Sequence, residues 1–164
     1  MKSGTEIKNT PKAKVRVLRI LCAAMMSGVT IFTVVFFFAG QTSGAPFASE
    51  AAPYRSEILL LLLALAGLAV FYSKYRWNKK MQRTRDAAGE LDTKLEAYKA
   101  ALLSYMSLCE MPSFFAVIVF FLTGEVVFLL VVPLSLFFMG AKLVAIGKLP
   151  EELQLNWQEE ESLK

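Results

Sequence analysis

The chain has 164 residues, of which 55% are hydrophobic, and its formal net charge is +4. The apolar residues are gathered into long blocks, which is typical of a membrane protein and argues against an ordinary soluble domain. The basic residues flank these blocks, where they would meet lipid headgroups, so we do not expect nucleic-acid binding. The chain has no histidine, which excludes a histidine-based metal or acid–base site.

The first apolar block covers residues 20–40 and follows a basic segment at 1–19. At 1.5 Å per residue it is long enough to cross a hydrocarbon core of about 30 Å, so we predict a first transmembrane helix here. A cleavable signal peptide also begins with basic residues, but its apolar core is shorter, at about 7–15 residues. We therefore predict a retained span, while the small residues at 43–45 leave the signal peptide as the alternative.

The second span is predicted at about 54–72, and a highly charged segment follows it at 74–99. Apolar residues recur within this segment at alternating spacings of four and three, which is the pattern of a helical seam. Because the second and third spans must run antiparallel, we predict a helical hairpin that turns near Gly89. The alternative is a single amphipathic helix that lies on the membrane surface.

The third and fourth spans are predicted at about 100–122 and 126–146. The residues between them are so few that the two helices must form a tight antiparallel pair. An acidic tail follows at 147–164, and Pro150 with the acidic residues after it indicates the start of a further helix.

Lysine and arginine indicate the orientation of these spans. They are numerous in segments 1–19 and 74–99, whereas the loop before the second span contains Arg55 alone and the tip between the last two spans contains none. The positive-inside rule then places both termini in the cytoplasm. We predict an all-α multipass protein of a bacterial inner membrane, with four transmembrane helices and a cytoplasmic helical hairpin between spans two and three.

Glu110 is the acidic residue that lies deep within a predicted span. An ionisable group at that depth costs roughly 2.5–3.5 kcal/mol or more, so it normally faces protein or water. Ser107 and Ser113 lie about one turn before and after it, and Pro112 should kink the helix and free a backbone carbonyl beside it. These groups together form a candidate site for a proton or a sodium ion.

Lys142 offers a structural alternative for this acid. It lies on the antiparallel fourth span, and its long side chain can reach the depth of Glu110. An ion pair between the two residues would need no transport function. Pro133 is expected to kink the fourth span as Pro112 kinks the third.

Residues 108–119 (LCEMPSFFAVIV) resemble the carboxylate helix of the rotor-ring c subunits of rotary ATP synthases, in which an acidic residue carries the translocated ion. Residues 110–124 also resemble a group of uncharacterised four-span bacterial membrane proteins. The glycine-rich first helix and polar Arg-x-Pro loop of c subunits are missing from this sequence. The resemblance therefore implies a proton or cation site at Glu110 and nothing about ring formation.

Two functions are consistent with these features. The first is a proton- or cation-responsive subunit of a transport or motor assembly that works through Glu110. The second is a scaffold or assembly factor that recruits a partner through the charged hairpin and the acidic tail. We expect membrane lipids as partners, with a homo-oligomer or a larger membrane complex as the assembly. No nucleophile–base pair, metal cluster or cofactor motif occurs in the sequence, so we do not expect an enzyme.

Overall fold

The computed structural model describes residues 11–45, 47, 52–86 and 91–153, and these residues form helices without any β-strand. The elements are α1 (Pro11–Ser43), the short 3₁₀ helix η1 (Ala52–Tyr54), α3 (Arg55–Asp86), α4 (Leu91–Thr123), η2 (Val126–Leu130), α5 (Val131–Ala145), η3 (Ile146–Lys148) and α6 (Leu149–Leu153). The last four follow one another as a single rod. Within the described residues, four helical rods are therefore long and apolar enough to cross a membrane.

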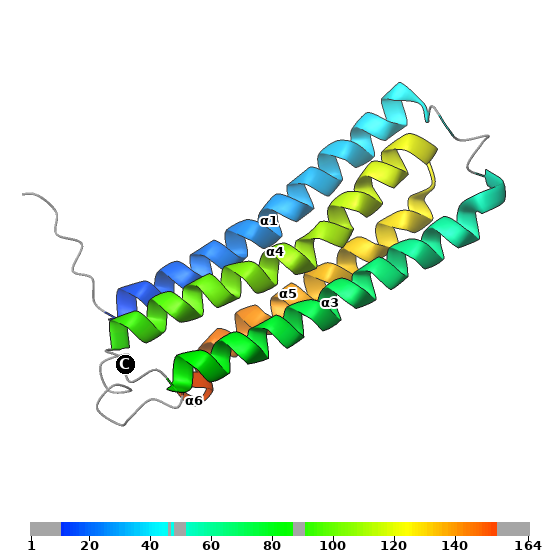
Figure 1. Cartoon of the computed structure of the whole chain (residues 1–164). Helices are drawn as coiled ribbons and strands as arrows, with labels where there is room; N and C mark the ends of the chain where they lie inside the picture. Colours follow the sequence, from blue (N-terminus) through cyan, green and yellow to red (C-terminus); the bar gives the residue numbers. More distant parts are fainter. Residues whose placement is uncertain (1–10, 46, 48–51, 87–90, 154–164) are drawn as a thin grey trace, which may run out of the picture.

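The four rods form an up-and-down bundle in which each rod runs opposite to the one before it in sequence (Figure 1). The start of α1, the end of α3, the start of α4 and α6 all lie at the same end, which we call the basic end. The opposite end, where α4 connects to η2, is called the far end. Consequently α3 and α5 run in the same direction, from the far end toward the basic end.

Helix α4 is the central element of the bundle. It packs against α1, α3 and α5, whereas α1 and α3 lie on opposite sides of the α4–α5 pair. In the most apolar window of each rod, 44% of α4 is buried but only 11% of α1. The third predicted span is therefore the one most enclosed by protein, and the first is mostly exposed to its surroundings.

Helix α1 is described from Pro11 and so extends beyond the predicted first span, which starts at residue 20. The basic segment 11–19 is thus helical and continuous with the apolar block. No glycine or proline interrupts the chain between Pro11 and residue 20, so the helix continues.

Helices α3 and α4 extend beyond the predicted spans, α3 to Asp86 and α4 back to Leu91. The two extensions pack on each other: the rings of Trp77 and Tyr98 meet edge to face with centroids 5.2 Å apart. The turn predicted near Gly89 and the tail beyond residue 153 lie outside the described residues. The charged segment 74–99 therefore contributes two antiparallel helical extensions to the bundle.

The connection between α4 and the fourth rod is as short as predicted. Gly124 has a positive φ of 74° and ends α4, and its N–H donates to the Phe120 carbonyl at 2.7 Å. This left-handed conformation closes a helix end and favours glycine. Next to it, a guanidinium nitrogen of Arg55 lies 3.1 Å from a carboxylate oxygen of Glu125, which ties the start of α3 to the tip.

Candidate functional site

The three residues of the predicted ion site differ in how far their side chains are buried. Ser107 is exposed, Glu110 is partly buried and Ser113 is completely buried. Each step of three residues rotates about 300° around the helix axis, so neighbouring positions are offset by about 60°. The three positions therefore pass from the outer face of α4 to its packed face. No hydrogen bond joins them, and the Ser113 hydroxyl is buried without a partner among the described residues.

The two prolines of the predicted kinks occupy different places. Pro112 is buried in the middle of α4. Pro133 is the third residue of α5, directly after the 3₁₀ helix η2. Pro133 therefore lies close to the junction of η2 and α5 within the fourth rod, and the kink expected there stays a prediction.

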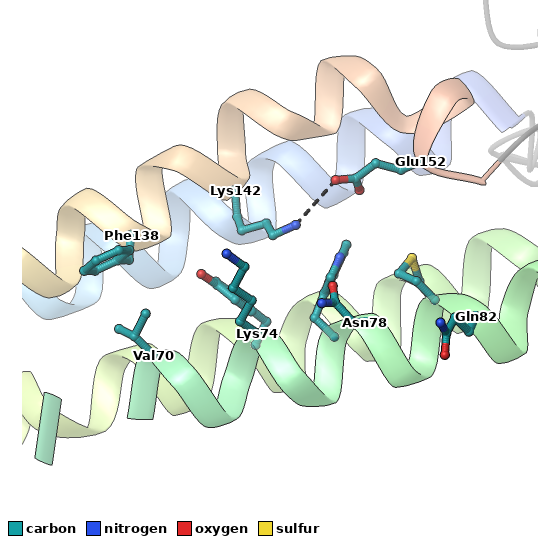
Figure 2. A pocket seen from close by; sticks show the side chains of 10 residues that line it. Val70, Lys74, Asn78, Gln82, Phe138, Lys142 and Glu152 are labelled. Atoms are coloured by element: carbon teal, nitrogen blue, oxygen red, sulfur yellow. Dashed lines mark hydrogen bonds and ion pairs between the residues drawn. The ribbon is translucent and has the colours of Figure 1, made fainter. Parts of the chain in front are cut away.

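Lys142 has a carboxylate partner, but that partner is Glu152 and not Glu110. The ammonium nitrogen of Lys142 lies 3.4 Å from a carboxylate oxygen of Glu152. The same nitrogen lies 3.8 Å from the centre of the Trp77 ring and 5.6 Å from that of Tyr105. Lys142 extends toward the basic end and Glu152 points back to meet it (Figure 2). The physical reason is that α6 follows α5 in the same rod and brings the Glu152 carboxylate within ion-pair distance of the lysine.

Glu152 also contacts α4. The Tyr98 hydroxyl donates a hydrogen bond to the second carboxylate oxygen of Glu152 at 3.0 Å, and the Tyr98 side chain is completely buried. One carboxylate thus joins α6 to α4 through Tyr98 and to α5 through Lys142. We call Trp77, Tyr98, Tyr105, Lys142 and Glu152 the aromatic–lysine cluster.

A pocket of about 530 Å³ opens beside this cluster, between α3 and α5. We call it the α3–α5 pocket; its lining residues are Val70, Lys74, Trp77, Asn78, Met81, Gln82, Tyr105, Phe138, Lys142 and Glu152. Lys74 and Asn78 point from α3 toward α5, and Lys142 points from α5 toward α3 (Figure 2). The pocket combines an apolar and aromatic wall with cations and amide groups, a composition that suits a small ligand with a charged head.

A further ion pair lies at the basic end. The Lys14 ammonium is 3.1 Å from an Asp92 carboxylate oxygen, which joins α1 to α4. The described residues contain no group of three or more cysteine or acidic side chains placed to hold a metal ion. At the basic end, the polar links to α4 from the other rods are made by Lys14 with Asp92 and by Glu152 with Tyr98.

Comparisons with protein families, with curated proteins and with solved structures found no match to this chain. Its own residues must therefore carry any functional conclusion.

Some residues of this site lie in elements that the sequence predicted. Trp77 and Tyr98 belong to the predicted seam, and Glu152 belongs to the predicted helix start after Pro150. Their meeting with Lys142 was missed because it requires α3 and α5, which are not consecutive spans, to be neighbours. The spacing of four between Lys74 and Asn78, and between Phe138 and Lys142, was the available clue, since such residues share a helix face.

Proposed function

We propose that this protein is a multipass membrane scaffold that recruits a partner at its basic end and has no catalytic role. Its outer surface supports the membrane location. Large apolar side chains are exposed on every rod, including Phe38, Leu61, Phe115 and Phe137. Such a surface is unfavourable in water but suits the hydrocarbon interior of a bilayer.

The charges support a cytoplasmic basic end. Lysine and arginine are frequent on the described parts of α1, α3 and α4 at this end, whereas the far end carries Arg55 paired with Glu125. This is the asymmetry that the positive-inside rule associates with the cytoplasm.

The observation that carries the scaffold role is the set of polar links at the basic end. Lys14–Asp92 joins α1 to α4, Tyr98–Glu152 joins α4 to α6, and Lys142–Glu152 joins α5 to α6. Together with the packed extensions of α3 and α4, they hold the charged end of the bundle in one conformation. A surface that is ordered in advance loses little conformational entropy when it binds a partner.

The orientation is tested by cysteine labelling in intact cells. Glu57→Cys places a thiol at the far end and Lys79→Cys places one at the basic end, both at exposed positions. A membrane-impermeant maleimide should label Glu57→Cys in intact cells and Lys79→Cys only after permeabilisation. Cys22 and Cys109 are buried, and the unsubstituted protein serves as the background control. Labelling of Lys79→Cys in intact cells would refute the orientation.

The scaffold role is tested by charge reversal on the exposed face of the α3 extension. Lys79→Glu with Arg83→Glu should remove specific partners from quantitative cross-linking and affinity purification. Glu57→Lys at the far end is the matched control and should retain them. Equal protein levels in the membrane would show that both variants insert. If the same proteins copurify with both variants, the basic end of α3 does not recruit a partner.

A second candidate function, a response to protons or cations, rests on Glu110 and Ser113. Neither side chain has a hydrogen-bond or ion-pair partner among the described residues, although the Ser113 hydroxyl is fully buried. A carbodiimide that modifies protonated carboxyls should label Glu110 in membranes, and sodium should suppress the labelling if a cation binds. Glu110→Gln, which lacks the reactive carboxyl, is the negative control for the labelling. An absence of labelling at every pH would exclude this function.

A further inference from the structure

The two walls of the α3–α5 pocket present apolar and charged residues in the same order along the helix axis. On α3, Val70, Lys74 and Asn78 follow one another at intervals of four and line the pocket. On α5, Phe138 and Lys142 line it at the same interval. Because α3 and α5 both run toward the basic end, each wall presents an apolar side chain first and a lysine one turn later (Figures 1 and 2).

The two lysines make the pocket attractive to an anion. Lys74 and Lys142 line the same pocket and extend into it from α3 and α5, so two like charges face each other across it (Figure 2). Glu152 is the one acidic residue among the lining residues, so the lining retains a net positive charge. The amides of Asn78 and Gln82 add neutral hydrogen-bond donors on the side of the basic end. An anion between the two ammonium groups would relieve their repulsion and accept a hydrogen bond from each.

The position of the pocket specifies an anion that carries an apolar chain. Tyr72 and Tyr75 are exposed on α3 at the level of Lys74, and tyrosine at the end of an apolar span marks the headgroup region. The apolar end of the pocket, at Val70 and Phe138, points toward the hydrocarbon interior. Basic pockets between helices at the cytoplasmic side of a membrane are suited to anionic lipid headgroups.

We propose that the α3–α5 pocket binds an anionic phospholipid, with its phosphate between Lys74 and Lys142 and its acyl chain along Val70 and Phe138. The volume of about 530 Å³ lies within the range of small-ligand sites. The proposal rests on the membrane location and orientation proposed above and is independent of the scaffold role.

Glu152 then acts as an internal competitor for the lipid. Its carboxylate lies 3.4 Å from the Lys142 ammonium, where it neutralises part of the charge that the phosphate would meet. Removal of this charge should strengthen phosphate binding. A purely structural role for the Lys142–Glu152 pair predicts no gain in lipid binding when Glu152 is neutralised, which makes the two roles separable.

The experiment is a lipid titration of the purified full-length protein in a neutral detergent, with bound lipids counted by native mass spectrometry. Phosphatidylglycerol is the anionic probe, phosphatidylcholine is the zwitterionic control, and inorganic phosphate is added as a competitor. Lys74→Gln removes one cation from the pocket. Lys79→Gln removes the same charge from an exposed position outside the pocket and is the matched control.

We expect one phosphatidylglycerol to bind in preference to phosphatidylcholine. Lys74→Gln should weaken that binding about tenfold, the effect of one charge-assisted hydrogen bond, while Lys79→Gln leaves it unchanged. Glu152→Gln should tighten it several-fold. Equal affinity for the two lipids, equal effects of the two lysine variants, or weaker binding by Glu152→Gln would overturn the proposal.

Inorganic phosphate distinguishes the lipid from a free anion. Millimolar phosphate should displace phosphatidylglycerol poorly, because the free ion lacks the acyl chain. Phe138→Ser, which makes the apolar end of the pocket polar, should weaken lipid binding. Efficient displacement by phosphate, together with unchanged binding by Phe138→Ser, would show that the pocket binds a soluble anion and that the lipid assignment is wrong.

Discussion

The ammonium nitrogen of Lys142 lies 3.8 Å from the centre of the Trp77 ring. This contact joins α5 to α3, and the same lysine pairs with Glu152 at 3.4 Å. The charge of this lysine is thereby compensated twice, by the electron-rich face of an indole and by a carboxylate. This lysine is therefore one of the contacts that join the second and fourth rods at the basic end.

Lys142→Met should therefore destabilise the bundle. Methionine retains the length and the apolar part of the side chain but loses the cation–π contact and the ion pair. The expected cost is about 1–2 kcal/mol, because both interactions are partly shielded from water. Thermal unfolding in detergent measures it, with Lys148→Met as the control because Lys148 is exposed. Equal melting temperatures for the two variants would contradict the assigned role.

Tyr98→Phe tests the other link of Glu152. The variant keeps the buried ring against Trp77 and removes only the hydroxyl that donates to Glu152 at 3.0 Å. We expect a loss of about 1 kcal/mol in unfolding free energy, the usual net value of one hydrogen bond. Tyr75→Phe is the matched control because Tyr75 is exposed, and its stability should not change. The comparison is made by denaturation in mixed micelles.

The sequence was sufficient to predict the four apolar helices and the short connection at the far end. Blocks of apolar residues determine where helices can cross a membrane, and the few residues around Gly124 allow only a tight antiparallel pair. The predicted first span at 20–40 marks the apolar block, whereas the described helix also includes the basic residues 11–19, because charged residues can continue a helix.

The candidate site was harder to predict because it depends on contacts between rods that are distant in sequence. Depth along the helix axis made Glu110 a reasonable partner for Lys142, but depth does not determine the direction in which a side chain points. Glu152 lies within the same rod as Lys142 and approaches it from the polar side. The spacing of Ser107 and Ser113 around Glu110 likewise specifies only their positions along the axis. Their difference in burial depends on which face of α4 meets the other helices.

Gly124→Ala should destabilise the far end. Gly124 has a φ of 74°, and a Cβ atom added there would lie 2.9 Å from the Cβ of Ala45. The left-handed backbone and this close contact together should cost about 1–2 kcal/mol. Gly28→Ala is the control: it lies within α1 with nothing near the added Cβ, and it should stabilise the helix by about 0.5–1 kcal/mol. Melting temperatures that shift in opposite directions would confirm both assignments.

Ser113→Ala separates a packing role from a ligand-binding role for the buried hydroxyl. The Ser113 oxygen has no hydrogen-bond partner among the described residues, so its desolvation is not compensated. Replacement by alanine should leave the bundle equally stable or stabilise it by up to about 1 kcal/mol.

Ser73→Ala provides the contrast for Ser113→Ala. The Ser73 hydroxyl is also buried, but it donates to the Val70 carbonyl at 2.9 Å and lies 3.5 Å from the Cys109 sulfur. Its loss should therefore cost about 0.5–1 kcal/mol in unfolding free energy. The two variants are compared by thermal unfolding with and without sodium. If the wild-type protein is stabilised by sodium and Ser113→Ala abolishes this effect while Ser73→Ala does not, the hydroxyl is a cation ligand beside Glu110. If sodium affects none of the proteins, Ser113 is a packing residue, and the ion-binding role of this helix loses its second ligand.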